Sequence, residues 1–244
     1  MSRFSRRSLL AGSTAVVYAR ASSVEHTTQK KLKVVATGAH PGDPEYGCGG
    51  TIARYTSLGN DVTLLYLNRG EKGCSGQSGK VCRGIRVAEG QRACQLLKAR
   101  PRFLDQIDGE AVVSPGQYDD FHGVLESEKP DVVFTHWPID NHRDHRAISM
   151  LVYDAWLQAN KNFCLYYYEV SNGEDTVMFS PTDYVDITRT DAIKRAACFA
   201  HASQSPERYY ALQSTVTRFR GIESGYEQAE AFISQTGNRG SLLP

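Results

Sequence analysis

The chain has 244 residues, 41% of them hydrophobic, so it can bury one sizeable core but is short for two full domains. Its 28 basic and 27 acidic residues nearly cancel, which argues against nucleic acid or an anionic membrane surface as its partner. It also lacks the roughly 18 consecutive apolar residues of a spanning helix, so we expect no membrane span and a small-molecule substrate.

The first 30 residues have the pattern of a targeting signal. Arg6 and Arg7 are the adjacent arginines of a twin-arginine motif, and a weakly apolar run at 9–19 follows them. We therefore expect export to the periplasm or the exterior, with 1–30 as signal and disordered segment and 31–244 as a single domain. The alternative is a disordered basic tail on a cytoplasmic protein.

Strand and helix patterns alternate after the signal. The apolar, β-branched run at 32–38 predicts a strand, and the helical spacing at 50–59 predicts a helix that ends at a glycine. A second strand at 61–68 and a second helix at 84–99 follow. Apolar strands that alternate with helices are typical of a parallel sheet covered on both faces.

The second half of the chain continues this pattern less regularly. A polar segment after residue 108 shows no clear element, and then a third strand is predicted at 131–137 and an amphipathic helix at 144–159. Beyond residue 160 we expect strands at 163–170 and 181–188, a helix at 189–204 and a final helix around 226–235. The fold class predicted is α/β, a Rossmann-like three-layer fold with a mostly parallel sheet.

Six cysteines form no C-x-x-C pair, which argues against a structural zinc ribbon. Cys74 and Cys82 flank a loop of glycine and serine that is flexible enough to close a disulfide if the protein is exported, and the sequence leaves this pair open. Cys94 lies in a helical pattern and Cys164 in a strand pattern. We expect both to be small buried hydrophobic residues.

Possible metal ligands gather in the loops that follow the strands at 32–38 and 131–137. In an open sheet of this kind, ligands bind at the carboxyl ends of the strands. Three histidine or aspartate ligands with a fourth position left open describe a catalytic zinc site, although another divalent ion is possible. The candidate ligands in the two loops are His40, Asp43, His136, Asp140, His142, Asp144 and His145.

The glycines at 47–50 raise a second hypothesis, a dinucleotide site in an oxidoreductase. The spacing does not match G-x-G-x-x-G, and Asn68 and Arg69 stand where an acidic residue is expected to close the second strand. The glycines are better explained by close packing of the helix that follows the metal loop.

Two segments resemble a known family. The stretch AHPGDPEYGCGG at 39–50 resembles the A-H-P-D-D-E…G-G motif of the LmbE-like, or PIG-L, zinc-dependent de-N-acetylases. The stretch PIDNHRDH at 138–145 resembles their second motif, P-x-D-x-H-x-D-H. Shorter likenesses extend over most of the chain after residue 32, and two motifs in the right order make the resemblance specific.

The resemblance implies a zinc site built from His40, Asp43 and His145. In that family the metal polarises an acetamide carbonyl and activates the water that attacks it, which releases a free amine and acetate. The implied activity is hydrolysis of an N-acetyl group on an N-acetylglucosamine-type sugar or glycoconjugate. The resemblance also implies a possible homo-oligomer.

The same resemblance assigns roles around the metal. His142 stabilises the tetrahedral oxyanion or protonates the departing amine, and Asp140 or Asp144 orients that imidazole. Arg86 and Asp108 match positions that contact sugar hydroxyls in relatives.

One departure from the family pattern bears on activity. Gly42 stands where the family has its general-base aspartate, and such a base contributes about a hundredfold to ten-thousandfold in rate. Zinc alone leaves a slower hydrolase, unless Glu45, Asp140 or Asp144 supplies the carboxylate. The remaining alternative is a noncatalytic, zinc-containing sugar-binding protein of the same fold.

Overall fold

The computed structural model describes residues 30–170 and 176–244, and Lys31–Pro244 form one compact unit. The expected export signal at 1–30 therefore lies outside the described residues, except for Lys30. A seven-stranded sheet with the order β3-β2-β1-β4-β5-β7-β6 forms the centre of this unit. Its strands are β1 Lys33–Gly38, β2 Asp61–Tyr66, β3 Arg100–Phe103, β4 Val132–His136, β5 Cys164–Tyr168, β6 Asp183–Asp186 and β7 Ala229–Ser234.

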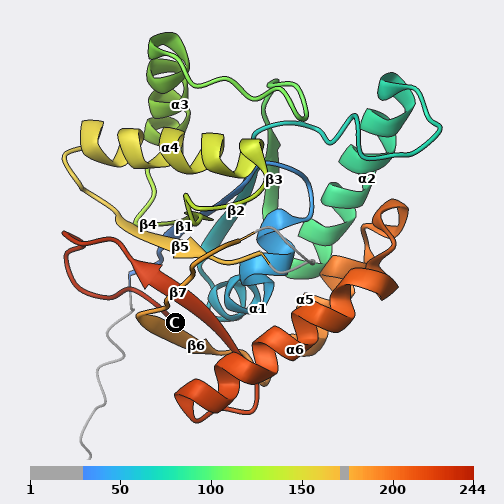
Figure 1. Cartoon of the computed structure of the whole chain (residues 1–244). Helices are drawn as coiled ribbons and strands as arrows, with labels where there is room; N and C mark the ends of the chain where they lie inside the picture. Colours follow the sequence, from blue (N-terminus) through green and yellow to red (C-terminus); the bar gives the residue numbers. More distant parts are fainter. Residues whose placement is uncertain (1–29, 171–175) are drawn as a thin grey trace, which may run out of the picture. The chain divides into compact units, whose positions relative to one another are not determined.

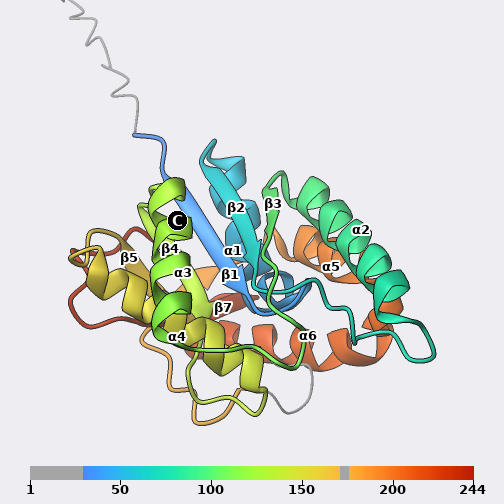
Figure 2. The ribbon, with the colours of Figure 1, turned by 90° about the horizontal axis from the view of Figure 1, so that it is seen from above.

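The first five strands of the sheet pair in parallel, and β7 pairs antiparallel with both β5 and β6. Helices cover both faces (Figures 1 and 2), with α3 and α4 on one face and α1, α2, α5 and α6 on the other. This arrangement confirms the predicted three-layer α/β fold. The helices are α1 Asp43–Ser57, α2 Gly79–Leu97, α3 Pro115–Glu128, α4 Arg143–Gln158, α5 Asp191–Phe199 and α6 Pro206–Ser224, with a short 3-10 turn η1 at Ala202–Gln204.

Side chains alternate between two cores along each central strand. Val34 and Ala36 of β1 pack under α1 and α2, whereas Val35 packs under α4. This follows from the two-residue period of a strand, which sends neighbouring side chains to opposite faces. A strand buried on both faces has the continuous apolar sequence that predicted β1 and β4.

The predicted helix around 226–235 is wrong, because this segment is strand β7. It lies between β5 and β6, and Phe232 packs against Phe134 with ring centroids 5.0 Å apart. A short apolar run does not distinguish a strand from a helix by its period alone. Its place in the sheet depends on pairing with strands far away in the sequence.

Three further elements were not predicted. The edge strand β3 has four residues and contains Pro101, so its sequence signal is weak. Helices α3 and α6 lie in polar sequence, yet both begin with proline in the first turn, and α6 ends at Gly225 in a left-handed conformation. The sequence signals at the helix ends therefore indicate both helices, whereas the hydrophobic period of their sequences does not.

The glycines of α1 permit close packing, as expected. A Cβ at Gly47 collides with the ring of Tyr168, and one at Gly50 lies 2.7 Å from Ile187. The helix is kinked at Cys48, and the second part begins where the Glu230 carboxylate accepts the amides of Gly50 and Thr51 at 2.9 and 2.7 Å. The Glu230 carboxylate of β7 therefore caps the second part of α1, after the kink at Cys48.

Cys74 and Cys82 form a disulfide with a Cα separation of 5.5 Å, so the possible pairing is confirmed. Cys94 and Cys164 are free and buried, as expected. Among the residues that the structure describes, no helix has both the length and the apolar character needed to cross a bilayer.

The buried pair Lys194–Glu230 supplies a stability prediction. Its Nζ–Oε1 distance is 2.5 Å, and the two side chains are 0% and 1% exposed. Lys194→Met leaves a buried carboxylate without its cation, which should lower the free energy of unfolding by about 3 to 5 kcal/mol. Chemical denaturation measures this loss.

The matched control is Lys31→Met at the exposed Lys31–Asp61 pair, whose side chains are 57% and 63% exposed. We expect this change to cost less than about 1 kcal/mol. Equal losses in the two variants would contradict the structural role given to Glu230.

Candidate metal centre

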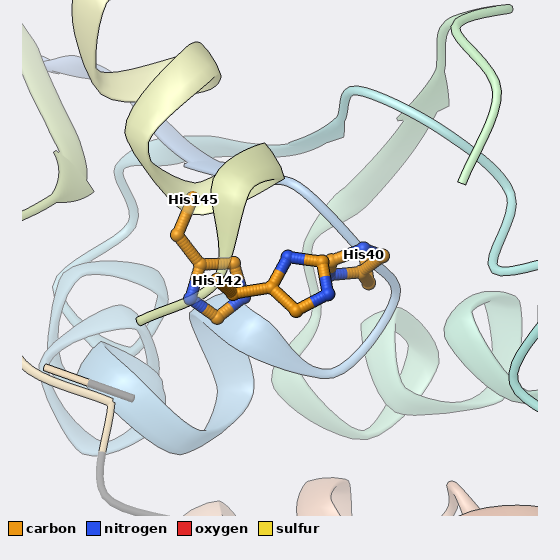
Figure 3. Close-up of side chains that lie close together, drawn as sticks. All are labelled: His40, His142 and His145. Carbon is orange, nitrogen blue, oxygen red and sulfur yellow. The ribbon is translucent and has the colours of Figure 1, made fainter. Parts of the chain in front are cut away.

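Two loops at the carboxyl end of the sheet bring the candidate ligands together. His40 follows β1 and Asp43 begins α1, whereas His136 ends β4 and His145 lies in the first turn of α4. β1 and β4 are neighbouring parallel strands, so their carboxyl ends meet at the same edge. Figure 3 shows the rings of His40, His142 and His145 gathered there.

The Asp43 carboxylate lies at the centre of this cluster. Its Oδ2 atom is 3.1 Å from His136 Nε2, 3.3 Å from His40 Nδ1 and 3.4 Å from His145 Nε2. Burial raises the Asp43 pKa, but the nearby imidazoles of His145 and His40 more than offset it and hold the pKa well below its usual value. Asp43 is therefore an anion, as a metal ligand must be.

Three sets of side chains in the described part of the chain have ligand atoms within 4.8 Å of one another. Their nitrogen and carboxylate oxygen donors, without thiolates, fit a catalytic rather than a closed structural zinc site. The predicted ligands His40, Asp43 and His145 meet at Asp43, and the structure adds His136, which the sequence marks only as a candidate. The sets are His40, His142 and His145; Asp43, His136 and His145; and His40, Asp108 and Asp144.

Burial lowers the pKa of both His142 and His145, and the neighbouring imidazoles lower it further. The backbone amide of Asp144 donates to His142 Nδ1 at 3.2 Å, so in the neutral ring the proton is on Nε2. His142 lines the cavity described below and offers it a neutral N–H donor.

The carboxylates of Asp140 and Asp144 orient other histidines than the sequence predicted. Asp140 Oδ1 contacts His145 Nδ1 at 3.0 Å, and Asp144 Oδ2 contacts His40 Nε2 at 3.2 Å. At His142, Asp140 Oδ1 accepts the backbone amide at 2.7 Å and the ring accepts the backbone amide of Asp144, so the orienting role of these carboxylates stays a prediction. Both carboxylates fix imidazoles predicted to bind the metal, the usual arrangement behind ligand histidines.

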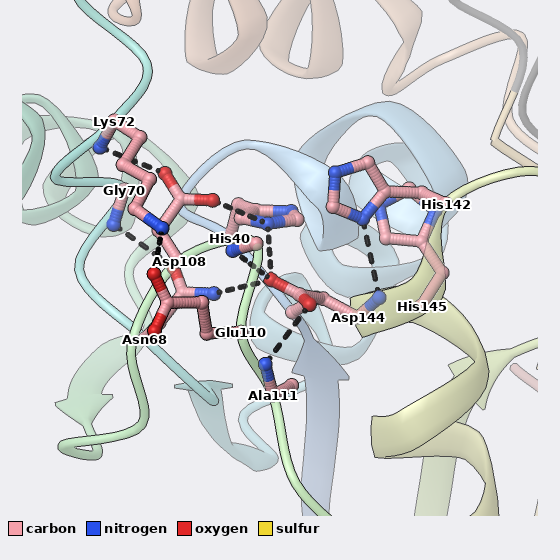
Figure 4. A network of polar contacts seen from close by, with 12 residues as sticks. His40, Asn68, Gly70, Lys72, Asp108, Glu110, Ala111, His142, Asp144 and His145 are labelled. Atoms are coloured by element: carbon pink, nitrogen blue, oxygen red, sulfur yellow. Dashed lines mark hydrogen bonds and ion pairs between the residues drawn. The ribbon is translucent and has the colours of Figure 1, made fainter.

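Asp144 also ties the surrounding loop to His40. Its carboxylate accepts the amides of Gly109 and Ala111 at 2.6 and 3.2 Å, and Asn68 Nδ2 lies 3.3 Å away (Figure 4). These bonds hold the segment that carries Asp108, whose Oδ1 atom lies 3.2 Å from His40 Nε2.

A cavity of about 500 Å³ opens over the cluster, a size ordinary for small-molecule sites. It is lined by the predicted residues His40, Asp43, His142 and His145 and by the two expected sugar-contacting residues, Arg86 and Asp108. Among the lining residues that the sequence did not single out, four come from α1, the turn before η1, η1 itself and α6. These are Tyr46, His201, Gln204 and Tyr209.

Glu45 lies beneath the cavity and is fully buried. Its Oε1 atom accepts from Tyr66 at 2.8 Å and lies 2.9 Å from His201 Nε2. The carboxylate is therefore directed at the core side of His201, away from the cavity lining. His201 was not singled out from the sequence, because a buried histidine in a polar turn has no pattern of its own.

The sequence of this chain matches the family model PIG-L, described as GlcNAc-PI de-N-acetylase, over residues 35–156. It is 28% identical over 216 residues to the diacetylchitobiose deacetylase of Thermococcus kodakarensis, covering 81% of each chain.

Solved structures agree with this similarity. A conserved protein of Thermus thermophilus is 28% identical with a TM-score of 0.75, covering 87% of this chain and 99% of its own. The N,N'-diacetylchitobiose deacetylase of Pyrococcus horikoshii, in complex with an inhibitor, is 25% identical with a TM-score of 0.75 and 87% coverage of both chains.

Removing a central ligand should abolish metal retention. We expect His40→Ala and His145→Ala to lose bound zinc after dialysis, because each takes one donor from a site of three or four. Elemental analysis measures the metal content. His122→Ala, on α3, is the control and should retain a full equivalent.

Metal binding should also release a proton. Burial lowers the His40 pKa, but contacts with Asp43, Asp108 and Asp144 raise it well above the usual 6.5. The ring is therefore protonated at pH 7 when no metal ion is bound. A ligand imidazole must be neutral, so zinc uptake releases about one proton, and affinity rises about tenfold per pH unit until the pH passes the raised pKa.

Calorimetric titration in buffers of different ionisation enthalpy counts the protons released. Asp144→Asn removes one anionic partner of His40 and should reduce the count. Proton release near zero at pH 7 in the unchanged protein would rule out a protonated His40.

Proposed function

Because the chain belongs to the PIG-L family, we propose that it is a metal-dependent amide hydrolase that removes the acetyl group from an N-acetylglucosamine-type sugar or glycoconjugate. The observation that carries this proposal is the meeting of His40, Asp43 and His145 at one edge of a cavity. The similarity to diacetylchitobiose deacetylases supports the substrate class.

The proposed metal is zinc, held by His40, Asp43 and His145. When bound there, it supplies a Lewis acid for the acetamide carbonyl and activates water for attack. His136 Nε2, 3.1 Å from Asp43, fixes that carboxylate from behind or serves as a further ligand. The carboxylates of Asp140 and Asp144 hold the two ligand imidazoles in place.

His142 is the proposed electrophilic residue. Its Nε2–H donates to the carbonyl oxygen as negative charge develops there, because the ring is neutral and its Nδ1 atom already accepts the Asp144 amide. Arg86 and Asp108 line the same cavity and are proposed to contact sugar hydroxyls. The cavity volume of about 500 Å³ suits a sugar of one or two rings.

A noncatalytic sugar-binding protein is the second candidate, and Gly42 favours it. Gly42 has φ of 115°, a conformation that side-chain-bearing residues rarely adopt, so the loop is built around a glycine rather than the family's aspartate. Glu45, Asp140 and Asp144 do not line the cavity, so their proposed role as a replacement base finds no support in their positions.

The proposed site of action is outside the cytoplasm. The Cys74–Cys82 disulfide supports the export proposed from the N-terminal sequence, because disulfides persist in oxidising compartments. A homo-oligomer remains a proposal, and the exposed Phe219 and Ile222 of α6 are apolar surface of the kind that subunit contacts cover.

The activity test measures free amine from N,N'-diacetylchitobiose with the zinc-loaded protein, with and without a chelator. We expect slow hydrolysis that the chelator stops. His142→Ala should lower kcat about a hundredfold to a thousandfold because an oxyanion donor is lost.

The zinc content of the His142→Ala protein distinguishes the roles open to His142. Retained zinc with reduced turnover is expected for an oxyanion donor. Loss of zinc would show that His142 is a ligand, and a full equivalent of zinc with no hydrolysis by the unchanged protein would favour the binding-only candidate.

A further inference from the structure

The cavity has an open place beside Gly42, next to the metal-binding cluster. Chain neighbours aside, the atoms nearest to a Cβ built on Gly42 are Arg86 Nη2 and His201 Cδ2 and Cγ, each 3.8 Å away. Gly42, Arg86 and His201 all line the cavity that also contains His40 and Asp43. The space beyond Gly42 therefore faces a guanidinium.

The three carboxylates considered as replacements do not line the cavity. Glu45 Oε1 is bound beneath the cavity by Tyr66 and His201, and its Oε2 atom is buried without a partner among the described residues. Asp140 holds His145 and Asp144 holds His40. The described residues thus place a cation beside Gly42 and direct these three carboxylates elsewhere.

Arg86 is fixed in position. Its Nη1 atom donates to Glu89 at 3.0 Å and lies 3.4 Å from His201 Nδ1, and Nη2 donates to the Pro41 carbonyl. The side chain is only 5% exposed. Each terminal nitrogen of a guanidinium carries two hydrogens, so Nη2 has a second N–H with which to meet a carboxylate. A planar, weakly hydrated cation also suits this anion.

We infer that a carboxylate from outside the chain, either free or carried by the substrate, binds beside Gly42 against Arg86 and acts as the general base. This inference rests on the proposed amide hydrolysis. A carboxylate at this place shares the cavity with the acetamide and the attacking water.

The proton balance closes with this carboxylate. As the water oxygen bonds to the acetamide carbon, one water proton passes to the carboxylate. The C–N bond then breaks and the nitrogen takes that proton, which gives the amine and acetic acid. The acetic acid passes the remaining water proton to the amine, so the products are the ammonium form of the amine and acetate. The carboxylate is regenerated as an anion, so no oxidant or other reactant is required.

The first experiment measures deacetylation by the zinc-loaded, full-length protein with formate, at ionic strength held constant with chloride. A built-in general base contributes about a hundredfold to ten-thousandfold, and a diffusing one loses part of this to ordering. With neutral diacetylchitobiose we expect a saturable rise of about tenfold or more.

The second arm distinguishes the two sources of the carboxylate. N-Acetylmuramic acid carries its own carboxylate, so a substrate-borne base predicts fast turnover without formate and little response to added formate. A free carboxylate predicts stimulation by formate with both sugars. Rates that respond neither to formate nor to the carboxylate of the sugar would overturn the inference and leave the hydrolase standing.

Binding supplies a readout separate from activity. Line broadening of ¹³C-formate should report binding with and without zinc, since the Arg86 place does not require the metal, and Arg86→Met should abolish it. If Arg86→Met does not fold, Arg86→Lys should weaken binding severalfold, because it keeps the charge and loses the planar fork.

Formate binding that depends on Arg86, with no hydrolysis of either sugar, would refute the proposed function and leave the carboxylate site. Formate binding unaffected by either Arg86 variant would refute the site.

Discussion

The contact between one carboxylate and three imidazoles is the interaction on which the site depends. Asp43 Oδ2 lies within 3.4 Å of ring nitrogens of His40, His136 and His145. Imidazoles gathered this closely repel one another when protonated, and the anion among them offsets that repulsion. The same donors are the proposed cation site once the rings are neutral, so in this proposal one arrangement serves both stability and metal binding.

The hydrogen-bond partner of each imidazole determines whether that ring is suited to bind a metal or to donate a hydrogen bond. Asp140 and Asp144 each fix an imidazole near Asp43, whereas a backbone amide fixes His142 and leaves its Nε2–H for the cavity. We propose that this difference in partner, a carboxylate or a backbone amide, separates the histidines that bind the metal from the one that donates a hydrogen bond. Position 42 is the exception, because its glycine carries no carboxylate where the family motif has an aspartate. The Arg86 guanidinium, bound on one side to Glu89, faces the open place beside this glycine.

The sequence predicted the parts of the fold that local pattern determines. Doubly buried strands such as β1 and β4 have continuous apolar runs, and their parallel pairing places His40 and His145 at one edge. The strand β7 was predicted as a helix because its identity depends on distant partners, and α6 was missed because its polar sequence carries little period. Asp140 and Asp144 contact the rings of His145 and His40, which the sequence did not predict because motif spacing does not fix which ring a carboxylate faces.

The most direct test of this account is anomalous diffraction at the zinc edge from crystals of the zinc-loaded protein. The account predicts a single strong peak at about 2.0 to 2.2 Å from nitrogens of His40 and His145 and an oxygen of Asp43. A zinc ion bound elsewhere, or those three side chains turned away from any metal, would contradict it.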